Sequence, residues 1–379
     1  MPFKIKDSVD VYLIPGSDGL AKLQFYKINT REKLTVEVSD EVPVVLSLLD
    51  GKRTLKEISK DEGVALNLEE ALEFFSFLEE RGFCVQVEEG DQLCLGAVEL
   101  DRYSRQLNFF SDYLSIRGDK AQKCLRDSHV VIFGAGGVGG SIAIQLARAG
   151  VGKFTIIDPK DVVEKNLERH EFVCMKDVGK AKVRALKEYL EKINTNIAVV
   201  PVKKSLYPKA ELGEYYSGHV DLVVNTADEP YIGYTTLKLG RMLWEKNVAL
   251  YSAGGFDAHL MCTGEFIIPG VTPCADCYSS YFSQALKDWK PSYMERTILG
   301  MEGAAVGGDD SNKLGAGGVA SQISFSASFA CIQILRYLVD KGGENIKYSA
   351  RGEYMANKGV MTWVEMARNK DCMLCGGSA

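Results

Sequence analysis

Apolar residues follow two kinds of spacing in the first 95 residues or so of the chain. Some short segments alternate apolar and polar positions, as strands do, and others place apolar residues three or four apart, as helices do. Strands are predicted over 9–14, 21–26, 34–38 and 83–87, and helices beginning at Ser39, Thr54 and Asn67. Three helices with flanking strands predict a small winged-helix-like α+β domain over residues 1–95.

Beyond residue 95 the pattern changes to strands and helices in alternation. Buried strands are expected over 130–133, 153–157, 197–202 and 220–225, with helices over 99–126, 137–149, 180–193 and 235–246. Such alternation predicts an α/β fold with a doubly wound, mostly parallel sheet of the Rossmann type over residues 96–379. After about residue 260 a few antiparallel strands, one helix and a long crossover loop near 283–315 are expected.

A glycine-rich turn follows the first strand of this second region. Its glycines are Gly134, Gly136, Gly137 and Gly139, and a helix begins there. Glycines let the backbone approach a phosphate, and a helix N-terminus offers N–H donors to it. Asp158 closes the next strand, where a carboxylate can accept hydrogen bonds from a ribose. This pattern predicts a nucleotide site, and by itself leaves a nicotinamide-dependent oxidoreductase open.

Charged residues further along favour adenylation over hydride transfer. Negative charge builds on the α-phosphate as pyrophosphate leaves, so an adenylation site needs cations. Arg169 and Lys182 can supply them, and Asp228, after the strand that ends near residue 225, can hold Mg²⁺. There is no GxxxxGK[ST] segment, so the chain is not a P-loop NTPase.

Taken together, these motifs resemble the E1-like superfamily, which includes the ThiF, MoeB, HesA and ubiquitin-activating enzymes. The segments that carry the resemblance are RYSRQ (102–106), GAGGVGG (134–140), Asp158, NLER (166–169), DVGKAK (177–182) and NTAD (225–228). The resemblance covers residues 100 to 379 and implies ATP on the glycine-rich turn, with Asp158 on the ribose. It also implies Asn166, Arg169 and Lys182 at the triphosphate and Asp228 on Mg²⁺.

Two further points follow from the same resemblance. Arg105 is expected to reach into the neighbouring subunit's site, which implies a homodimer in which Arg105, Arg169, Lys182 and Asp228 carry the catalysis. His170 is a departure, because the family often has Gln after the Arg of the NLER segment.

The ten cysteines are too few for a disulfide scaffold, but four of them form two CxxC pairs. Cys274 with Cys277, and Cys372 with Cys375, can each put two thiolates on one tetrahedral ion. The spacing alone leaves redox pairs or chance open, and the resemblance implies a split Cys₄ structural zinc site. No cysteine lies between Cys277 and Cys331, so a ubiquitin-type thioester step is not expected.

The N-terminal domain points to a peptide substrate. The segments LLDGKRTL (48–55) and FLEERGF (77–83), with the strands and helices around them, resemble a PqqD-like precursor-recognition element. The resemblance implies that residues 1–95 bind the leader of a precursor peptide as an added strand along 34–38. A generic oligomerisation or packing domain is the alternative.

These inferences predict a peptide-maturation enzyme similar to the pantocin- and microcin-type enzymes of antibiotic biosynthesis. It would use ATP to adenylate a carboxylate of a ribosomally made peptide, either a Glu or Asp side chain or the C-terminus. Intramolecular attack would then give a cyclised or dehydrated product. The alternatives are activation of a ubiquitin-like sulfur-carrier protein and a catalytically dead, peptide-binding scaffold.

Composition limits the remaining partners and the location. The formal net charge is −6, which provides no basic field for nucleic acid. The apolar fraction is 46%, yet no apolar run approaches the roughly 18 residues of a membrane span, so no membrane is expected. The N-terminus lacks the apolar stretch of a secretory signal, which predicts a cytoplasmic protein.

Overall fold

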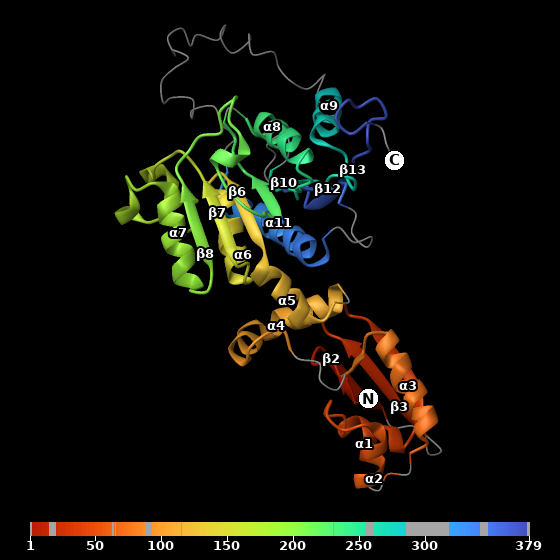
Figure 1. The fold of residues 1–379 in the computed structure, drawn as a ribbon. Coiled ribbons are helices and arrows are strands. Elements are labelled where there is room, and N and C mark those ends of the chain that lie inside the picture. Colours follow the sequence, from red (N-terminus) through yellow and green to blue (C-terminus); the bar gives the residue numbers. More distant parts are fainter. Residues whose placement is uncertain are drawn as a thin grey trace, which may run out of the picture. The chain divides into compact units, whose positions relative to one another are not determined.

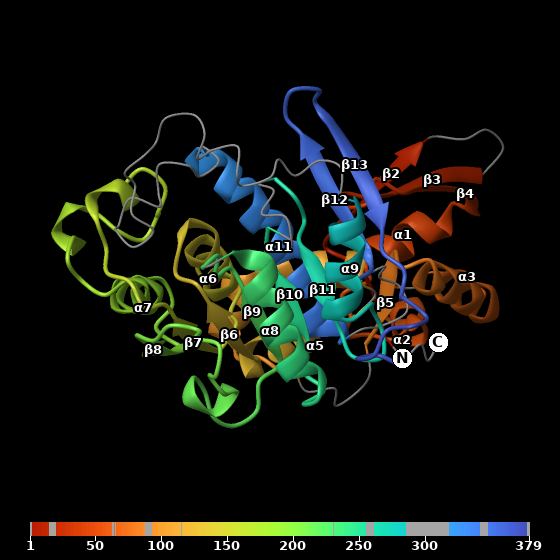
Figure 2. The ribbon, with the colours of Figure 1, turned by 90° about the horizontal axis from the view of Figure 1, so that it is seen from above.

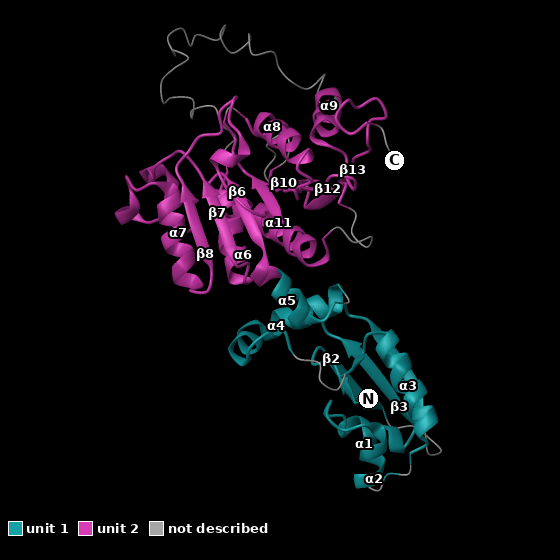
Figure 3. Ribbon diagram, viewed as in Figure 1, with its two compact units in different colours: residues 1–124 teal, residues 125–379 magenta. Residues whose placement is uncertain are grey.

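The chain forms two compact units in the computed structural model, residues 1–124 and residues 125–379 (Figure 3). The boundary falls inside a helix rather than at residue 95. The assignment of residues 1–95 to a separate domain stays a prediction. The structure describes residues 2–14, 20–62, 64, 66–87, 93–114, 116–229, 231–254, 261–285, 318–341 and 348–376. Most of the expected crossover loop near 283–315 lies outside these residues.

The first unit contains two small antiparallel sheets. Its strands are β1 (Phe3–Ile5), β2 (Val9–Ile14), β3 (Leu20–Lys27), β4 (Lys33–Ser39) and β5 (Cys84–Gln86). β2, β3 and β4 form a meander in that order, and β1 pairs with β5. The sequence predicted all of these strands except β1, whose three residues are too few to show a period.

Three helices pack on these sheets: α1 (Glu41–Ser47), α2 (Leu55–Asp61) and α3 (Leu68–Glu80). They begin where the sequence predicted. The shared core consists of apolar side chains from both sheets and from the helices, among them Phe3, Leu23, Phe25, Val45, Phe75, Leu78 and Phe83. The winged-helix likeness of this arrangement stays a prediction.

A single predicted helix over 99–126 is two helices in the structure, α4 (Ala97–Tyr113) and α5 (Gly118–Asp127). Gly118 begins α5 close against α4. A Cβ there would lie 2.7 Å from the Cα of Leu107, so the close approach requires glycine.

The second unit is built on a six-stranded sheet with the order β11-β10-β9-β6-β7-β8. Its strands are β6 (His129–Phe133), β7 (Lys153–Ile157), β8 (Ala198–Val202), β9 (Leu222–Asn225), β10 (Leu250–Ser252) and β11 (Glu265–Ile267). All neighbours pair in parallel except β10 with β11. The predicted α/β fold with a mostly parallel sheet is confirmed. The strand order reverses between β6 and β9, the point where such sheets bind ligands.

Helices pack in two groups around this sheet (Figure 1). They are α6 (Gly137–Arg148), α7 (Lys182–Ile193), α8 (Ile232–Trp244), α9 (Ala275–Ala285) and α11 (Ala320–Asp340), with short 3₁₀ turns η1 (Glu164–Asn166), η2 (Met175–Asp177) and η3 (Leu212–Glu214). α6 contacts α7 and α11, and α8 contacts α9. The core on the α8 side includes Val131, Phe133, Val223, Leu239, Leu243 and Leu250.

After residue 260 the described chain has two helices, α9 and α11, where the sequence predicted one. A hairpin of β12 (Ala350–Met355) and β13 (Val360–Glu365) follows α11 and is drawn in blue in Figure 2.

By length and composition alone, the helix α11 is long and apolar enough to cross a membrane. Ser, Gln and Arg residues interrupt its apolar positions, so it is not the uninterrupted apolar run that the sequence was expected to lack. One face of α11 is buried at Ile323, Ala327, Cys331 and Ile334, and the helix packs against α6. Its apolar character is explained by this place in the core of the second unit.

Candidate nucleotide site and cysteine cluster

The glycine-rich turn lies at the carboxyl end of the central strand β6. Gly134 has a φ of +99°, which disfavours any residue with a Cβ. Its N–H donates to the carbonyl of Ile157 at 2.8 Å, and its own carbonyl accepts from the hydroxyl of Thr226 at 2.9 Å. These bonds fix the turn between the ends of β7 and β9.

The other glycines of the turn have different surroundings. A Cβ on Gly139 would collide with the carbonyl of Gly134, and one on Gly137 would lie 2.9 Å from the side chain of Ile323. A Cβ on Gly136 would meet nothing within 4 Å among the described residues. Gly136 is the N-cap of α6, and no described side chain caps the helix there. The open space beside this helix start suits an anionic group.

Asp158 organises the turn from the neighbouring strand. One oxygen of its buried carboxylate accepts from the N–H of Ala135 at 2.8 Å, and the other from the N–H of Lys160 at 2.8 Å. A carboxylate has about four lone-pair sites, so two remain for a ligand. The proposed bond to a ribose stays a prediction.

Lys182 lies at the start of α7 and is buried. Burial lowers the pKa of its ammonium, and the charge of Lys160 lowers it further. The negative charges of Asp158 and Asp228 act in the opposite direction, but the net pKa is lowered. These charges act on one another because the ends of β7 and β9 and the start of α7 meet here. The fold thus brings together three of the residues that the sequence predicted.

The position of Asp228 is set by its neighbour Asn225, whose side chain is fully buried. The Asn225 amide donates to the hydroxyls of Thr235 and Thr236 at 2.9 and 2.8 Å and accepts from the N–H of Ala227 at 3.1 Å. These bonds tie the loop after β9 to α8, and leave Asp228 exposed beyond it. Asn225 is a positioning residue that the sequence marked only as part of a motif.

The NLER segment begins at Asn166, the last residue of the 3₁₀ turn η1. The side-chain oxygen of Asn166, which is buried, accepts from the N–H of Val163 at 3.0 Å. Arg169 is partly exposed, with Nε 3.7 Å from a carboxylate oxygen of Glu168. Asn166 therefore has a local structural role in addition to the predicted phosphate contact. Arg105 lies on α4, which belongs to the first unit, and its predicted role in a neighbouring subunit stays a prediction.

His170 is buried and stacks on Phe172 with ring centroids 5.6 Å apart. Its Nδ1 has no hydrogen-bond partner among the described residues. Burial, then the charges of Lys182 and Arg169, lower the pKa of the imidazole to about 4. The departure from the family pattern therefore places a neutral ring beside the two predicted phosphate cations.

Lys160 and Glu229 are not among the site residues predicted from the sequence. Lys160 follows Asp158 by two residues, and its Nζ forms an ion pair with the carboxylate of Glu229. The sequence feature that could have identified Lys160 is its position two residues after Asp158, the expected ribose ligand.

The four cysteines of the two CxxC pairs form one cluster, with all sulfur atoms within 4.8 Å of one another. The Sγ–Sγ distances are 3.7 Å for Cys274–Cys277, 3.4 Å for Cys274–Cys372 and 3.6 Å for Cys277–Cys375. Sulfurs about 2.3 Å from a tetrahedral Zn²⁺ would be about 3.8 Å apart, close to this arrangement. The donor set fits zinc, and the N–H of Asn369 donates to Cys277 Sγ as a supporting contact.

Residues 103–374 match the ThiF family, and the chain therefore belongs to that family. Protein HesA (heterocyst) of Trichormus variabilis is 32% identical over 189 residues, 48% of this chain and 64% of that protein. The molybdopterin-synthase adenylyltransferase of Escherichia coli is 32% identical over 188 residues, 49% of this chain and 70% of that protein. The chain thus spans slightly less than two thirds of the HesA relative.

Solved structures share the fold over nearly the whole chain. E. coli MccB with ATP has a TM-score of 0.69 at 19% identity, covering 99% of this chain and 100% of that chain. The microcin C7 biosynthetic enzyme MccB in complex with N-formylated MccA has a TM-score of 0.66 at 19% identity over the same shares. PaaA has a TM-score of 0.67 at 22% identity, covering 95% and 99%.

Proposed function

We propose that this protein is an ATP-dependent enzyme that activates a carboxylate as an acyl-adenylate. The observation that carries the proposal is the meeting of the glycine-rich turn with Lys182, Asp158 and Asp228 at the strand-order reversal. Its membership of the ThiF family supports the same reaction. A hydride-transfer site needs few cations near its phosphates, so the buried ammonium of Lys182 favours adenylation.

The side chains divide the work of adenylation as follows. The amides at the start of α6 and the ammonium of Lys182 bind the phosphates, and Arg169 stabilises the charge that develops as pyrophosphate leaves. Burial makes the Lys182 charge more effective, since fewer waters screen it. Asp228 is the residue that would hold Mg²⁺, which supplies further positive charge to the phosphates when bound.

We further propose that the carboxylate belongs to a ribosomally made precursor peptide. MccB structures match 99% of this chain, including the first unit, and one of them is a complex with N-formylated MccA. The HesA and E. coli adenylyltransferase matches cover only about half of the chain. The proposal extends to attack by a group of the same peptide, which gives a cyclised or dehydrated product, and to a homodimer in the cytoplasm completed by Arg105.

The first unit offers an open sheet edge for such a peptide. β4 pairs with β3 alone in the described sheet. The N–H of Lys27 donates to the carbonyl of Glu32, so these two residues form a hydrogen-bonded pair. Along antiparallel strands such pairs alternate with pairs whose backbone groups point away from each other. The backbone groups of Lys33, Thr35 and Glu37 therefore point away from β3. A leader peptide can add there as a strand through main-chain hydrogen bonds.

Activation of a ubiquitin-like sulfur carrier remains the second candidate. The molybdopterin-synthase adenylyltransferase of E. coli and the adenylyltransferase and sulfurtransferase uba4 of Aspergillus clavatus support it, at 32% and 36% identity to this chain over the segments they match. This candidate requires no peptide at β4.

For the cysteine cluster we propose a structural zinc ion held by Cys274, Cys277, Cys372 and Cys375. The four thiolates would fill a tetrahedral ion and leave no position for a reactant. The ion would tie the C-terminal tail to the start of α9.

The deciding experiment is ATP–pyrophosphate exchange with candidate precursor peptides and, separately, with small Gly-Gly-tailed carrier proteins. Exchange that depends on a peptide supports the first candidate, and exchange that depends on a carrier supports the second. Asp228→Ala should reduce exchange by at least about 100-fold, as loss of a charge-stabilising group does. Full activity of that variant would exclude Asp228 as the Mg²⁺ ligand.

The peptide edge is tested separately by Thr35→Pro, which removes an outward N–H without removing a main-chain hydrogen bond to β3. The side-chain bond from Gln24 on β3 to the Thr35 hydroxyl is lost in this variant and equally in the control below. Peptide Kd should rise about tenfold or more while ATP binding persists. Thr35→Val is the matched control, because it keeps the N–H and the strand. Equal peptide affinity in all three proteins would contradict binding along β4.

A further inference from the structure

The ion pair between Lys160 and Glu229 spans the end of the central strand. Lys160 follows β7, Glu229 follows β9, and β6 lies between these two strands in the sheet. The glycine-rich turn emerges from β6 at the same end. The pair therefore joins the two sides of the candidate nucleotide site beside the turn.

The surroundings of the Lys160 ammonium are strongly acidic. Burial lowers its pKa, but the hydrogen bond and charge of Glu229 and the charges of Asp228 and Asp158 outweigh that effect and raise it. The side chains of Lys160 and Glu229 are 49% and 60% exposed. An ion pair this exposed contributes little to stability, so its partners can be exchanged readily.

We propose that Lys160 is a third cation for the nucleotide phosphates and that Glu229 competes with the nucleotide for it. The proposal rests on the ATP-dependent function above and adds a residue to that site. Lys160 lies two residues after Asp158, the expected ribose ligand. Its charge interacts with those of Lys182 and Asp228. A phosphate group carries more charge than a carboxylate and offers more acceptor oxygens, so it can take the ammonium from Glu229.

Competition gives opposite signs for the two halves of the pair. Lys160→Gln should weaken binding of ATP about five- to tenfold, whereas Glu229→Gln should tighten it about two- to fivefold, since it frees the ammonium. The double variant should bind like Lys160→Gln alone, because Glu229 acts only through Lys160. A structural role for the pair would instead weaken binding in both single variants.

A matched control lies nearby. Lys203 follows β8 and pairs with Asp161 at 2.6 Å, and its side chain is 49% exposed, the same fraction as Lys160. Lys203→Gln removes the same charge and an equivalent surface pair. ATP affinity should stay within about twofold of the unaltered protein.

The test is calorimetric titration of the full chain with Mg²⁺ and an ATP analogue that carries a methylene group between its α- and β-phosphates. Adenosine is titrated in parallel, and its affinity should not change, since it has no phosphate. Unchanged analogue binding in Lys160→Gln, or weaker binding in Glu229→Gln, would overturn the proposal. Failure of the proposed function is distinguishable, because the unaltered protein would then bind no analogue at all.

Discussion

At the scale of single residues, the glycines of the turn are not equivalent. A Cβ on Gly139 meets the carbonyl of Gly134, whereas one on Gly136 meets open space. At Gly139, packing inside the protein excludes a larger residue. At Gly136, only a bound ligand would contact an added side chain, so substitutions at the two positions test folding and ligand binding separately.

We expect Gly139→Ala to lower the melting temperature, because overpacking of this kind costs about 1–3 kcal/mol. Gly136→Ala should lower the melting temperature less, because alanine is only a poorer N-cap there. It should weaken ATP binding, since its methyl group occupies the expected phosphate space. Thermal unfolding and titration with nucleotide check both variants. Unchanged ATP affinity in folded Gly136→Ala would place the phosphates elsewhere.

His170 makes stability depend on pH. The unfolded chain takes up a proton near the ordinary histidine pKa of about 6.5, whereas the folded chain resists it until the lowered pKa of about 4. The folded state is therefore penalised as pH falls through that window. His170→Gln should reduce the loss of melting temperature between pH 7 and pH 5. The reason is that the variant lacks the group that binds up to about one proton when the chain unfolds. The same loss in both proteins would mean that folding does not lower the pKa of His170.

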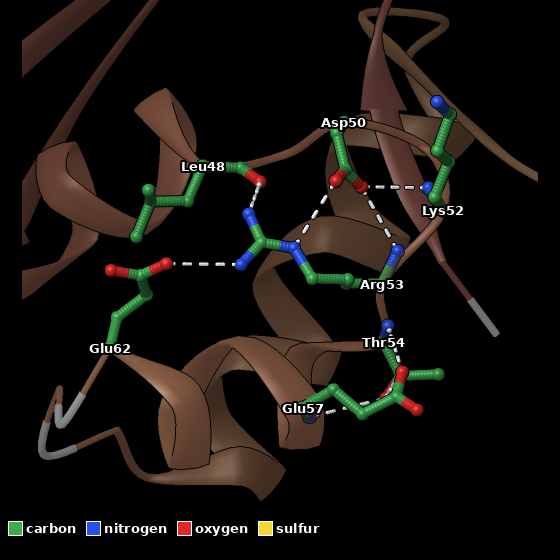
Figure 4. A network of polar contacts seen from close by, with 7 residues as sticks. All are labelled: Leu48, Asp50, Lys52, Arg53, Thr54, Glu57 and Glu62. Carbon is green, nitrogen blue, oxygen red and sulfur yellow. Dashed lines mark hydrogen bonds and ion pairs between the residues drawn. The ribbon is translucent and has the colours of Figure 1, made fainter.

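At the scale of elements, the turn between α1 and α2 is held by a polar network (Figure 4). One oxygen of Asp50 accepts from the N–H groups of Lys52 and Arg53 at 2.7 and 2.9 Å. Hydrogen bonds from Arg53 and Lys52 lower the pKa of Asp50 to about 2. The Arg53 guanidinium also bonds Glu62 at 3.0 Å, which links the start of α2 to its end.

The same figure shows the capping box that begins α2. The Thr54 hydroxyl accepts from the N–H of Glu57 at 3.2 Å, and the Glu57 carboxylate accepts from the N–H of Thr54 at 2.8 Å. Thr54→Ala should destabilise α2 by about 1 kcal/mol, whereas Thr54→Ser should be close to neutral. Hydrogen exchange of the full chain, followed in residues 55–61, measures both. Equal protection in the alanine variant would show that packing alone fixes this helix.

At the scale of the whole molecule, the cysteine cluster joins segments that are remote in sequence. Residues 278–371 lie between the two CxxC pairs, yet their sulfurs meet. A metal here therefore closes a long loop within the second unit and should stabilise the C-terminal tail.

Purified protein should contain about one zinc per chain. Cys375→Ser should lose the metal and lower the melting temperature by more than about 5 °C, since 1 kcal/mol corresponds to roughly 2–4 °C in a unit of this size. Cys174→Ser, which removes an exposed cysteine outside the cluster, is the control. Retention of zinc in Cys375→Ser would contradict the four-thiolate site.

Local patterns determined much of the fold. The strands of the parallel sheet and the helix starts at Thr54 and Gly137 follow from apolar periodicity, capping residues and glycines, which act over a few neighbouring residues. The family of the chain followed from its ordered motifs. The strand β1 and the break between α4 and α5 could not be predicted from the sequence. β1 depends on pairing with β5, far along the chain, and the break depends on close packing at Gly118.

The candidate site shows the same division. Its glycines and charged residues were recognisable in the sequence by type and spacing. Only the tertiary structure decided that Lys182 is buried between Asp158 and Asp228, that Glu229 reaches Lys160, and that the ring of His170 is kept neutral. The physical reason is that burial and charge depend on which strand ends are adjacent, and this is set by the order of strands in the sheet.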